Sequence, residues 1–510
     1  MGNNPLKSLV KQTAVYGLSS IVGRLLNYLL VPLYTHLIFD THEYGVVILM
    51  YSYVAFLLVL LTYGMETAFF RFYQNRPESK NQVLGTALYP LFFTSSLFVI
   101  AAITFRVPVS EALGFSGNAN FITLMALIVG LDVMTAIPFA LLRAENKALK
   151  FATLKFINIG VNIGLNLFFF LLCPWLLQHG PESLRSLIDV IYNPDIGVGY
   201  VFIANLVASS ITFLLMLPAV LARKSSFSVL LIKSMLIYAL PLMVAGLAGI
   251  ANDSMGKIML SQMLPAADAM SQLGIYGASY KIAILVTLFI QAYRLAADPF
   301  FFSNASNPDA PELYGRVMKY FIVVCAFIFI FVTQFIDIIQ HFVGAAYRDG
   351  LGVVPVLLLA NILLGVYFNL SVWYKVAGKT HYGIYISLAG VLAAFALNLI
   401  LIPQIGYYGA AWATAAGYGV MALLAYLTGT KNFPIPYDLL RMGAFAGLAA
   451  GIFFLGKLAG NLDPITRHFF SASMLVAFGL VVCLLDKDIK NTTLQVLHRI
   501  SGLSVFEHKK

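Results

Sequence analysis

The chain has 510 residues, of which 60% are hydrophobic and 11% are charged. Soluble globular domains carry about 25% charged residues, so this composition excludes a water-covered globular protein and indicates a membrane protein. The net charge is +10. In a membrane protein, basic residues collect in the cytoplasmic loops, so we predict no nucleic-acid partner. The three cysteines lie in apolar stretches and form neither a disulfide pattern nor a zinc pattern.

A membrane-spanning helix needs about 20 mostly apolar residues, and fourteen segments of the sequence meet this requirement. The first has no cleavage site after it, so we expect a retained helix rather than a signal peptide. The seventh is too long for one straight span, and its Pro241, Gly246 and Gly249 predict a kink or an unwound turn. The predicted spans are residues 13–38, 44–70, 83–105, 119–142, 151–177, 196–221, 230–263, 273–298, 317–340, 351–374, 382–403, 406–428, 438–459 and 466–485.

The Lys and Arg residues predict which side each connection faces. With the N-terminus inside, twenty-four of the 32 basic residues fall on inner segments, four in outer loops and four within spans. This distribution is a strong positive-inside signal, so we predict a multi-pass protein with both termini in the cytoplasm. The outer loops are short, and function must therefore reside among the helices.

Two stretches of the sequence repeat at a constant offset of 232 residues. Both begin in an inner loop and enter the next helix, six helices apart, so a repeat of this kind preserves orientation and is parallel. Chance similarity between two apolar helices is the alternative. A weaker similarity pairs Glu43-Tyr44-Gly45 with Gln272-Leu273-Gly274. The repeated positions are Arg143, Lys147 and Leu165-Asn166-Leu167, matched by Lys375, Lys379 and Leu397-Asn398-Leu399.

The repeat predicts an all-α membrane protein of about 14 transmembrane helices in two six-helix lobes, related by a parallel pseudo-two-fold repeat, plus two C-terminal helices. The N-terminal lobe covers residues 1–222 and the C-terminal lobe 223–430. Helices 13 and 14 cover 431–485, and a basic cytoplasmic tail covers 486–510. The cleft between the lobes is the expected substrate site, reached alternately from each face.

Of the four basic residues within predicted spans, Lys457 is close to an outer end, and the other three lie deeper. An ionisable side chain in the bilayer centre costs about 2.5–3.5 kcal/mol on insertion scales. Arg24 is in the middle of the first helix and either binds an anionic group or forms a structural ion pair. Lys257 lies four residues after Asp253, on the same helix face, so the pair either neutralises itself or opens on binding. Lys281 either faces the cavity or extends to the outer surface. We predict that Arg24, Lys257 and Lys281 bind the substrate.

Ion coupling or gating is predicted for a second set of ionisable residues. Asp132 either relays protons or is a capped structural carboxylate, while Glu66 is at the inner end of helix 2. Arg294 and Asp298 form another four-apart pair, either structural or a gate. We predict H⁺ or Na⁺ as a coupling ion, and no metal site, other cofactor or catalytic residue. The ion-coupling or gating set is Asp253, Asp132, Glu66, Arg294 and Asp298.

The predicted interior is net positive, since three cations in helices 1, 7 and 8 face one carboxylate, Asp253. A diphosphate would bind there favourably, whereas a cationic drug would not. Aromatic residues such as Tyr276 and Tyr280 either pack against sugars or belong to the interfacial aromatic belts.

The stretch Asn398–Thr414, with Pro403, Gly406 and Gly409, resembles the pattern N-x3-I-P-x2-G-x2-G-A-A-x-A-T of the polysaccharide transporter family, the Wzx-type flippases. Residues 142–147 are similar to another family feature, and the resemblance extends over about residues 10–430. It implies membership in the multidrug/oligosaccharidyl-lipid/polysaccharide (MOP) superfamily and a MATE-like fold.

The resemblance implies a flippase that moves undecaprenyl-diphosphate-linked oligosaccharide, a repeat unit of O-antigen, capsule or exopolysaccharide. Transport would run from the cytoplasmic to the periplasmic leaflet of the bacterial inner membrane, by alternating access and with ion-gradient coupling. The implied partners are this substrate, membrane lipids, a polysaccharide polymerase and glycosyltransferases.

Three alternatives stay open. A lipid II-type flippase also has fourteen helices and a cationic cleft, and helices 13 and 14 would then form a groove for the lipid tail. A MATE-type drug or cation antiporter would have an acidic cleft. A membrane polymerase or ligase would have a large outer loop rich in Arg and His. The sequence contains no P-loop, zinc motif or nucleophile elbow, so we predict that the protein is not an enzyme.

Overall fold

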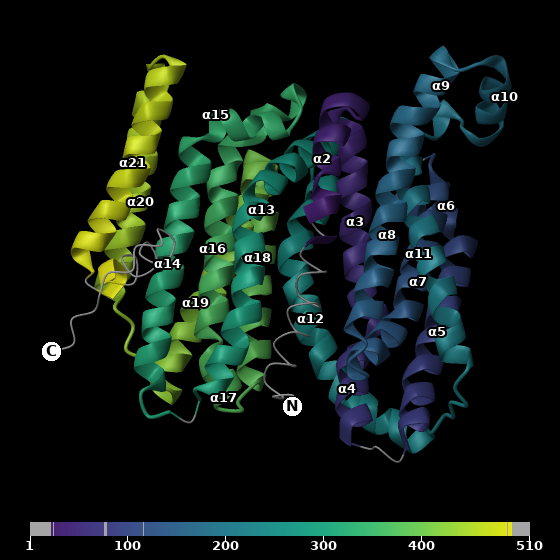
Figure 1. Cartoon of the computed structure of the whole chain (residues 1–510), viewed down its shortest axis with the longest axis horizontal. Helices are drawn as coiled ribbons and strands as arrows, with labels where there is room; N and C mark the ends of the chain where they lie inside the picture. Colours follow the sequence, from purple (N-terminus) through teal and green to yellow (C-terminus); the bar gives the residue numbers. More distant parts are fainter. Residues whose placement is uncertain are drawn as a thin grey trace, which may run out of the picture. The chain divides into compact units, whose positions relative to one another are not determined.

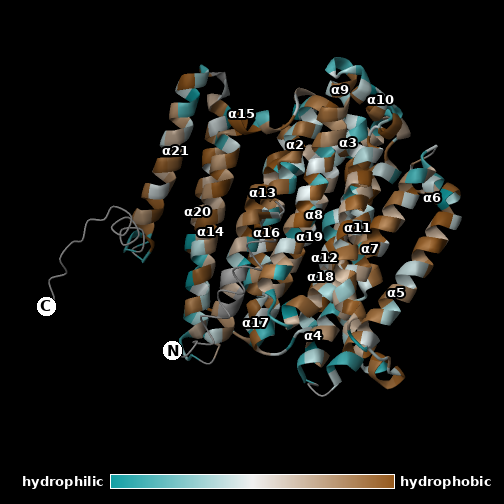
Figure 2. Ribbon diagram, turned by 45° about the vertical axis from the view of Figure 1, so that its right-hand side comes forward, coloured by the Kyte–Doolittle hydropathy of each residue, from teal (hydrophilic) through white to brown (hydrophobic). Residues whose placement is uncertain are grey.

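The computed structural model describes residues 22–23, 25–75, 79–115, 117–305, 307–486 and 488–491, without the side chains of residues 295, 296, 298, 299 and 461. All secondary-structure elements in this part of the chain are helices. Thirteen of them are long and apolar enough to cross a membrane, and they correspond to the second to fourteenth predicted spans. The first predicted span is described only over Leu25–Ile38, a shorter apolar helix. Hydrophobic residues cover most of the length of these helices, as Figure 2 shows. The predicted all-α membrane fold is confirmed.

The described chain divides into two compact units. The first comprises residues up to Lys281 together with Phe342–Val353 and Thr380–Met421. Helices α13 (Ala266–Ser303) and α19 (Tyr407–Asn432) begin in this unit and continue into the other. The longer helices that belong wholly to the first unit are α3 (Thr41–Thr62), α4 (Met65–Asn75), α5 (Lys80–Thr104), α7 (Ala119–Ala144), α8 (Ala148–Leu167), α10 (Glu182–Ile191), α11 (Gly199–Leu221), α12 (Val229–Met263) and α18 (His381–Ile405).

Short helical segments complete the first unit. A π-helical turn over Tyr34–Ile38 follows α2, and another over Phe168–Leu172 joins α8 to α9. The segment Ala345–Val353 is a 3-10 helix. The remaining short helices are α2 (Leu30–Leu33), α6 (Arg106–Ala112), α9 (Cys173–His179) and a 3-10 turn over Pro194–Ile196.

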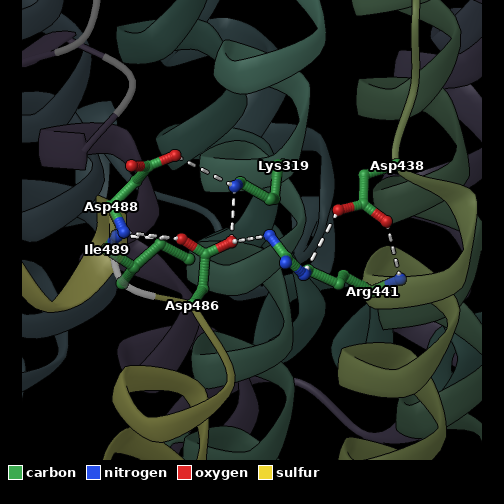
Figure 3. A network of polar contacts seen from close by, with 6 residues as sticks. All are labelled: Lys319, Asp438, Arg441, Asp486, Asp488 and Ile489. Atoms are coloured by element: carbon green, nitrogen blue, oxygen red, sulfur yellow. Dashed lines mark hydrogen bonds and ion pairs between the residues drawn. The ribbon is translucent and has the colours of Figure 1, made fainter.

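The second unit is built around helix α14 (Ala310–Gln334). The two C-terminal helices, α20 (Leu439–Leu458) and α21 (Pro464–Leu485), pack against α14 and against each other (Figure 1). A continuous apolar cluster that includes Ile330, Phe445 and Phe478 joins these three helices. Lys319 of α14 forms a buried ion pair with Asp486, as Figure 3 shows. The helices of this unit are α14 (Ala310–Gln334), α15 (Ile336–Ile339), α16 (Val354–Leu370), α17 (Val372–Val376), α20 (Leu439–Leu458) and α21 (Pro464–Leu485), with 3-10 turns at Gln340–Phe342 and Ala459–Asn461.

Helix α12 is continuous over its whole length, so the unwound turn predicted around Pro241 is absent from it. Proline removes one backbone donor and crowds the preceding turn. In a span the surrounding helices can stabilise such a position, and α12 packs against both α3 and α18. The predicted unwound turn is therefore wrong, while the kink that the sequence offered as the alternative stays a prediction.

Two glycines bring the N-terminal parts of α3 and α13 into close contact within the first unit. A methyl group added to Gly45 would collide with the backbone oxygen of Met270, and one added to Gly274 would collide with that of Thr41. Small residues permit this approach between membrane helices. These are the two glycines that the weaker sequence similarity paired, and they lie at the helix ends predicted to face outward.

The segment between α15 and α16 also packs on the first unit. The Tyr347 hydroxyl donates hydrogen bonds to the backbone oxygens of Asp40 (2.7 Å) and Phe39 (3.0 Å). The Gly344 amide donates to Thr35 Oγ1 at 3.1 Å. Such contacts group parts of the predicted second lobe with the first, so the compact units differ from the predicted lobes. The boundaries 222/223 and 430/431 stay predictions, since grouping by contact does not test a repeat.

Two turns show the same backbone hydrogen bonds at the predicted offset. The Lys147 amide donates to the Leu142 oxygen, and the Lys379 amide donates to the Tyr374 oxygen, each at 2.8 Å. The residue before each lysine, Asn146 (φ 56°) or Gly378 (φ 69°), adopts the left-handed conformation. This is the geometry of a Schellman motif, which ends a helix by satisfying its last carbonyls.

Candidate functional site

Helices α12 and α13 bring a carboxylate, an ammonium group and a phenol together inside the first unit. Lys257 Nζ lies 3.2 Å from Asp253 Oδ2, as the four-residue spacing predicted. The hydroxyl of Tyr280 donates a hydrogen bond to Asp253 Oδ1. Lys257 Nζ also lies 4.3 Å from the centre of the Tyr280 ring, a cation–π contact. The Lys257 side chain is 11% exposed and the Asp253 side chain is 34% exposed, so the ammonium group is largely enclosed by protein while the carboxylate is partly open.

Lys281 adds a second cation to this group. It follows Tyr280 directly on α13, and its backbone oxygen accepts a hydrogen bond from the Tyr28 hydroxyl. Among the described residues, the structure gives the Lys281 ammonium group no hydrogen bond or ion pair. Asp253 therefore neutralises Lys257, and one positive charge is left over.

Two buried asparagines lie near this group on the same or a neighbouring helix: Asn252 directly precedes Asp253 on α12, and Asn398 of α18 packs against Gly256 of α12. Asn252 is 2% exposed and Asn398 is 1% exposed. Both side-chain atoms of Asn252 and the Oδ1 atom of Asn398 have no hydrogen-bond partner in the described part of the chain. Burying an amide without a partner is costly, so these atoms favour a site that water or a polar ligand reaches.

The ion-coupling or gating residues lie in different places. Asp132 accepts a hydrogen bond from Ser209 Oγ at 2.8 Å. Glu66 forms an ion pair with Arg143 of α7. Arg294 belongs to the second unit, where its guanidinium carbon lies 3.8 Å from the centre of the Phe368 ring. The predicted roles of Asp132, Asp253, Glu66 and Arg294 stay predictions.

Two of the predicted site residues fall outside the part of the chain that the structure describes. Arg24 lies outside the described residues, and Asp298 is described without its side chain. Their predicted roles, in substrate binding and gating, therefore stay predictions. Within the described residues, no cluster of three His, Cys, Asp or Glu residues is placed to hold a metal ion.

Sequence reasoning left the role of Tyr280 open between sugar packing and an interfacial belt. The structure places its hydroxyl on Asp253. A signal was available, since Tyr276 and Tyr280 are four apart and face the same side of a helix. What sequence could not supply was the rotation of α13 that directs this face toward Asp253 on α12.

No protein-family profile and no curated protein sequence matches the chain. Among solved structures, the lipid II flippase MurJ in an inward closed conformation is similar with a TM-score of 0.65 and 14% identity, covering 91% of this chain and 98% of that one. An inward-facing multidrug resistance MATE family transporter of the MOP superfamily has a TM-score of 0.61 and 14% identity, covering 85% of this chain and 95% of that one.

The chain has the fold of these transporters. A third similar structure is that of the MATE multidrug transporter DinF-BH, with a TM-score of 0.59 and 17% identity, covering 83% of this chain and 96% of that one. At such identities the likeness extends to the fold alone.

Proposed function

We propose that this protein is a flippase that moves undecaprenyl-diphosphate-linked oligosaccharide from the cytoplasmic to the periplasmic leaflet of a bacterial inner membrane. The surplus positive charge of Asp253, Lys257 and Lys281 carries the proposal. A diphosphate is anionic and accepts several charge-assisted hydrogen bonds, whereas the same surplus charge repels a cationic drug. Arg24 is proposed as a further cation of this site.

The close approach of Gly45 and Gly274 supports an alternating-access mechanism. These glycines lie at helix ends predicted to face outward, so this conformation is closed on that side at that point. Substrate would enter from the cytoplasmic side, its diphosphate would bind Lys281, and the polyprenyl chain would stay in lipid. The outer helix ends would then separate and release the headgroup.

Coupling to an H⁺ or Na⁺ gradient is part of the proposal, with Asp253 as the coupling residue. Its carboxylate has two partners, Lys257 and Tyr280. A diphosphate that attracts Lys257 would take away one of them, and the carboxylate would then bind a cation or proton more readily. A polysaccharide polymerase and glycosyltransferases are the proposed partners, because they consume and supply such a substrate.

The test is flipping of undecaprenyl-diphosphate-linked oligosaccharide by the purified protein in lipid vesicles. We expect Lys281→Met to lower the flipping rate about tenfold, the value for losing one hydrogen bond to a charged group. Lys457→Met is the matched control, since Lys457 lies beside the Phe453 ring of α20 in the second unit. An unchanged rate in Lys281→Met would contradict the proposed site.

The same vesicles distinguish the alternatives. Export of a cationic dye, with no flipping of the lipid-linked glycan, would instead identify a MATE-type antiporter. Flipping of lipid II alone would identify a lipid II-type flippase. Growth of glycan chains in the vesicles would identify a polymerase and contradict the proposal.

A further inference from the structure

The first unit contains a polar chamber, lined in part by Asp132 and Glu66, to which the proposed function assigns no ligand. Its volume is about 370 Å³, within the usual range for small-ligand pockets. It is lined by residues of five helices, α3, α4, α7, α8 and α11. Ten of its fourteen lining residues are polar or charged: Thr62, Glu66, Asp132, Thr135, Arg143, Lys155, Asn158, Asn205, Ser209 and Thr212.

The polar residues that line the chamber fall on one face of each otherwise apolar helix. On α7 the lining positions are 132, 135, 136, 139 and 143, which share one helix face. They extend over twelve residues, and the eleven steps between the first and the last cover about 16 Å at 1.5 Å per residue. On α11 the lining positions 205, 209 and 212 likewise share a face. Polar side chains on several spans usually face a cavity rather than lipid.

The chamber has an end where its side chains reach solvent. Glu66 and Arg143 form an ion pair there, with 41% and 34% of their side chains exposed. Both belong to helix ends predicted to face the cytoplasm. The chamber therefore opens on the side from which a flippase takes its substrate, and Asp132 lies deeper along α7.

Its walls offer hydrogen-bond acceptors. Ser209 Oγ donates to Asp132 Oδ1, Asn158 Nδ2 donates to Thr212 Oγ1 at 3.0 Å, and Asn205 Nδ2 donates to the Tyr51 hydroxyl at 3.2 Å. The structure gives Asp132 Oδ2 and the amide oxygens of Asn158 and Asn205 no hydrogen-bond donor among the described residues. A ligand that donates several hydrogen bonds would satisfy all three.

Charge and size select among ligands that donate. The ionisable lining residues are two cations, Arg143 and Lys155, and two carboxylates, Glu66 and Asp132, so the formal charge is zero. A diphosphate finds no surplus cation here. A bare metal ion needs oxygens at about 2.3–2.6 Å on several sides, and a chamber of about 370 Å³ is too wide for that.

We propose that this chamber binds the uncharged sugar part of the lipid-linked substrate, while Lys281 binds its diphosphate. The inference rests on the proposed function and extends it. Sugar hydroxyls donate to Asp132, Asn158 and Asn205, and they bring no charge that must be neutralised. Asp132 then recognises a saccharide and replaces the ion-coupling or gating role predicted from the sequence.

The experiment compares three probes on the full-length protein in lipid nanodiscs: bare undecaprenyl diphosphate, the same lipid carrying a neutral trisaccharide, and the free trisaccharide. We expect the trisaccharide to tighten lipid binding about tenfold. Asn158→Leu and Asp132→Asn should each lower the affinity for the glycan-bearing lipid about tenfold. The affinity for the bare lipid should stay unchanged. Asn162→Leu, one turn along α8 and outside the lining, is the matched control.

Each outcome decides a separate point. If the bare lipid binds and the trisaccharide adds nothing, the chamber assignment is wrong and the flippase proposal stands. If the bare lipid fails to bind while the free trisaccharide binds and Asn158→Leu abolishes that binding, the chamber stands and the flippase proposal fails. If neither probe binds, or if Asp132→Asn changes only Na⁺ or H⁺ binding, the sugar assignment is overturned.

Discussion

Ionisable side chains inside the helices have partners on neighbouring helices. Asp253 has Tyr280 of α13 in addition to Lys257 of its own helix, and Asp132 has Ser209 of α11. An unpaired charge in a low-dielectric interior is costly. Each of these partners therefore stabilises a charged side chain at a position that the proposed function requires. Lys281 differs, because the described residues provide no such partner, and this difference makes it the strongest candidate for binding an anion.

Glu145 shows the same principle outside the membrane, in the turn after α7. Its carboxylate lies 2.5 Å from Arg223 Nη2 and 2.8 Å from Lys147 Nζ, and it accepts a hydrogen bond from the Tyr73 hydroxyl at 3.1 Å. Desolvation alone would raise the pKa of Glu145, but the hydrogen bonds from Lys147 and Arg223 outweigh it and hold the pKa below the ordinary 4.5. The charged form therefore stabilises the fold.

We expect Glu145→Gln to lower the free energy of unfolding by about 1 kcal/mol at pH 7, the upper range for partly exposed ion pairs. A lowered folded-state pKa gives stability that is present above the unfolded-state pKa and is lost as pH falls through the folded-state pKa. The difference in melting temperature between variant and parent should thus shrink below pH 4.5. A difference that stays constant from pH 7 to pH 3 would contradict this role.

At the scale of elements, the contact between α3 and α13 depends on having no side chain at Gly45 and Gly274. Each glycine faces the backbone of the other helix, so the approach is closer than any larger residue allows. Alternating access requires that such a contact can open. The stability of this closed contact relative to the open state should therefore fall when a larger side chain replaces either glycine.

We expect Gly274→Val to open the outer ends of α3 and α13. Overpacking costs about 1–3 kcal/mol, which raises the open population about tenfold. The measurement is labelling of a cysteine at Ala278, which is fully buried one turn further along α13, by an impermeant maleimide added outside. Gly447→Val on α20 is the control, because an added carbon there meets nothing within 4 Å. Equal labelling rates in both variants would refute the gate.

The two C-terminal helices depend on a different kind of contact. Asp486, at the end of α21, accepts an ion pair from buried Lys319 of α14 and another from Arg441 at 3.3 Å. Its Oδ1 atom also accepts hydrogen bonds from the amides of Asp488 and Ile489 (Figure 3). Burial by itself would raise the pKa of Asp486. The hydrogen bonds from Lys319 and from these amides outweigh burial and hold the pKa below its ordinary value, so the carboxylate stays charged. One carboxylate thus links three helices.

Removing one partner of this pair should leave a buried charge. We expect Lys319→Met to lower the free energy of unfolding by about 3 kcal/mol, measured by thermal unfolding of the purified protein. Combining it with Asp486→Asn should cost less than the sum of the two single changes, because the second change removes the stranded charge. Strict additivity would show that the pair contributes nothing to holding α20 and α21 on α14.

At the scale of the whole molecule, the basic residues still predict the orientation. The turns after α7 and α17 carry Lys147 and Lys379 in matching conformations at the repeat offset, and both are predicted to face the cytoplasm. Two repeats in parallel orientation require their equivalent turns to lie on one side. Orientation therefore tests the repeat as well as the topology.

We expect alkaline phosphatase fused after Gly117 or Gly197 to be active, because Gly117 lies in a predicted outer loop and Gly197 lies at the predicted outer end of the sixth span. Enzyme fused after Gly378 or at the C-terminus should be inactive. The same fusions with green fluorescent protein should show the reverse pattern. Activity after Gly378 would invert the second half and contradict both the positive-inside assignment and the parallel repeat.

Apolar segment length determined the helices, since a bilayer demands about 20 apolar residues per span, and the thirteen described spans agree with the sequence. The spacing of Asp253 and Lys257 likewise determined their pairing. Tertiary structure alone decided that Tyr280 reaches Asp253, that Gly45 meets Gly274, that Lys319 is buried on Asp486, and that polar stripes on five helices enclose one chamber. A one-dimensional pattern fixes which face of a helix is polar, whereas the neighbour that this face meets depends on how the helices rotate and pack.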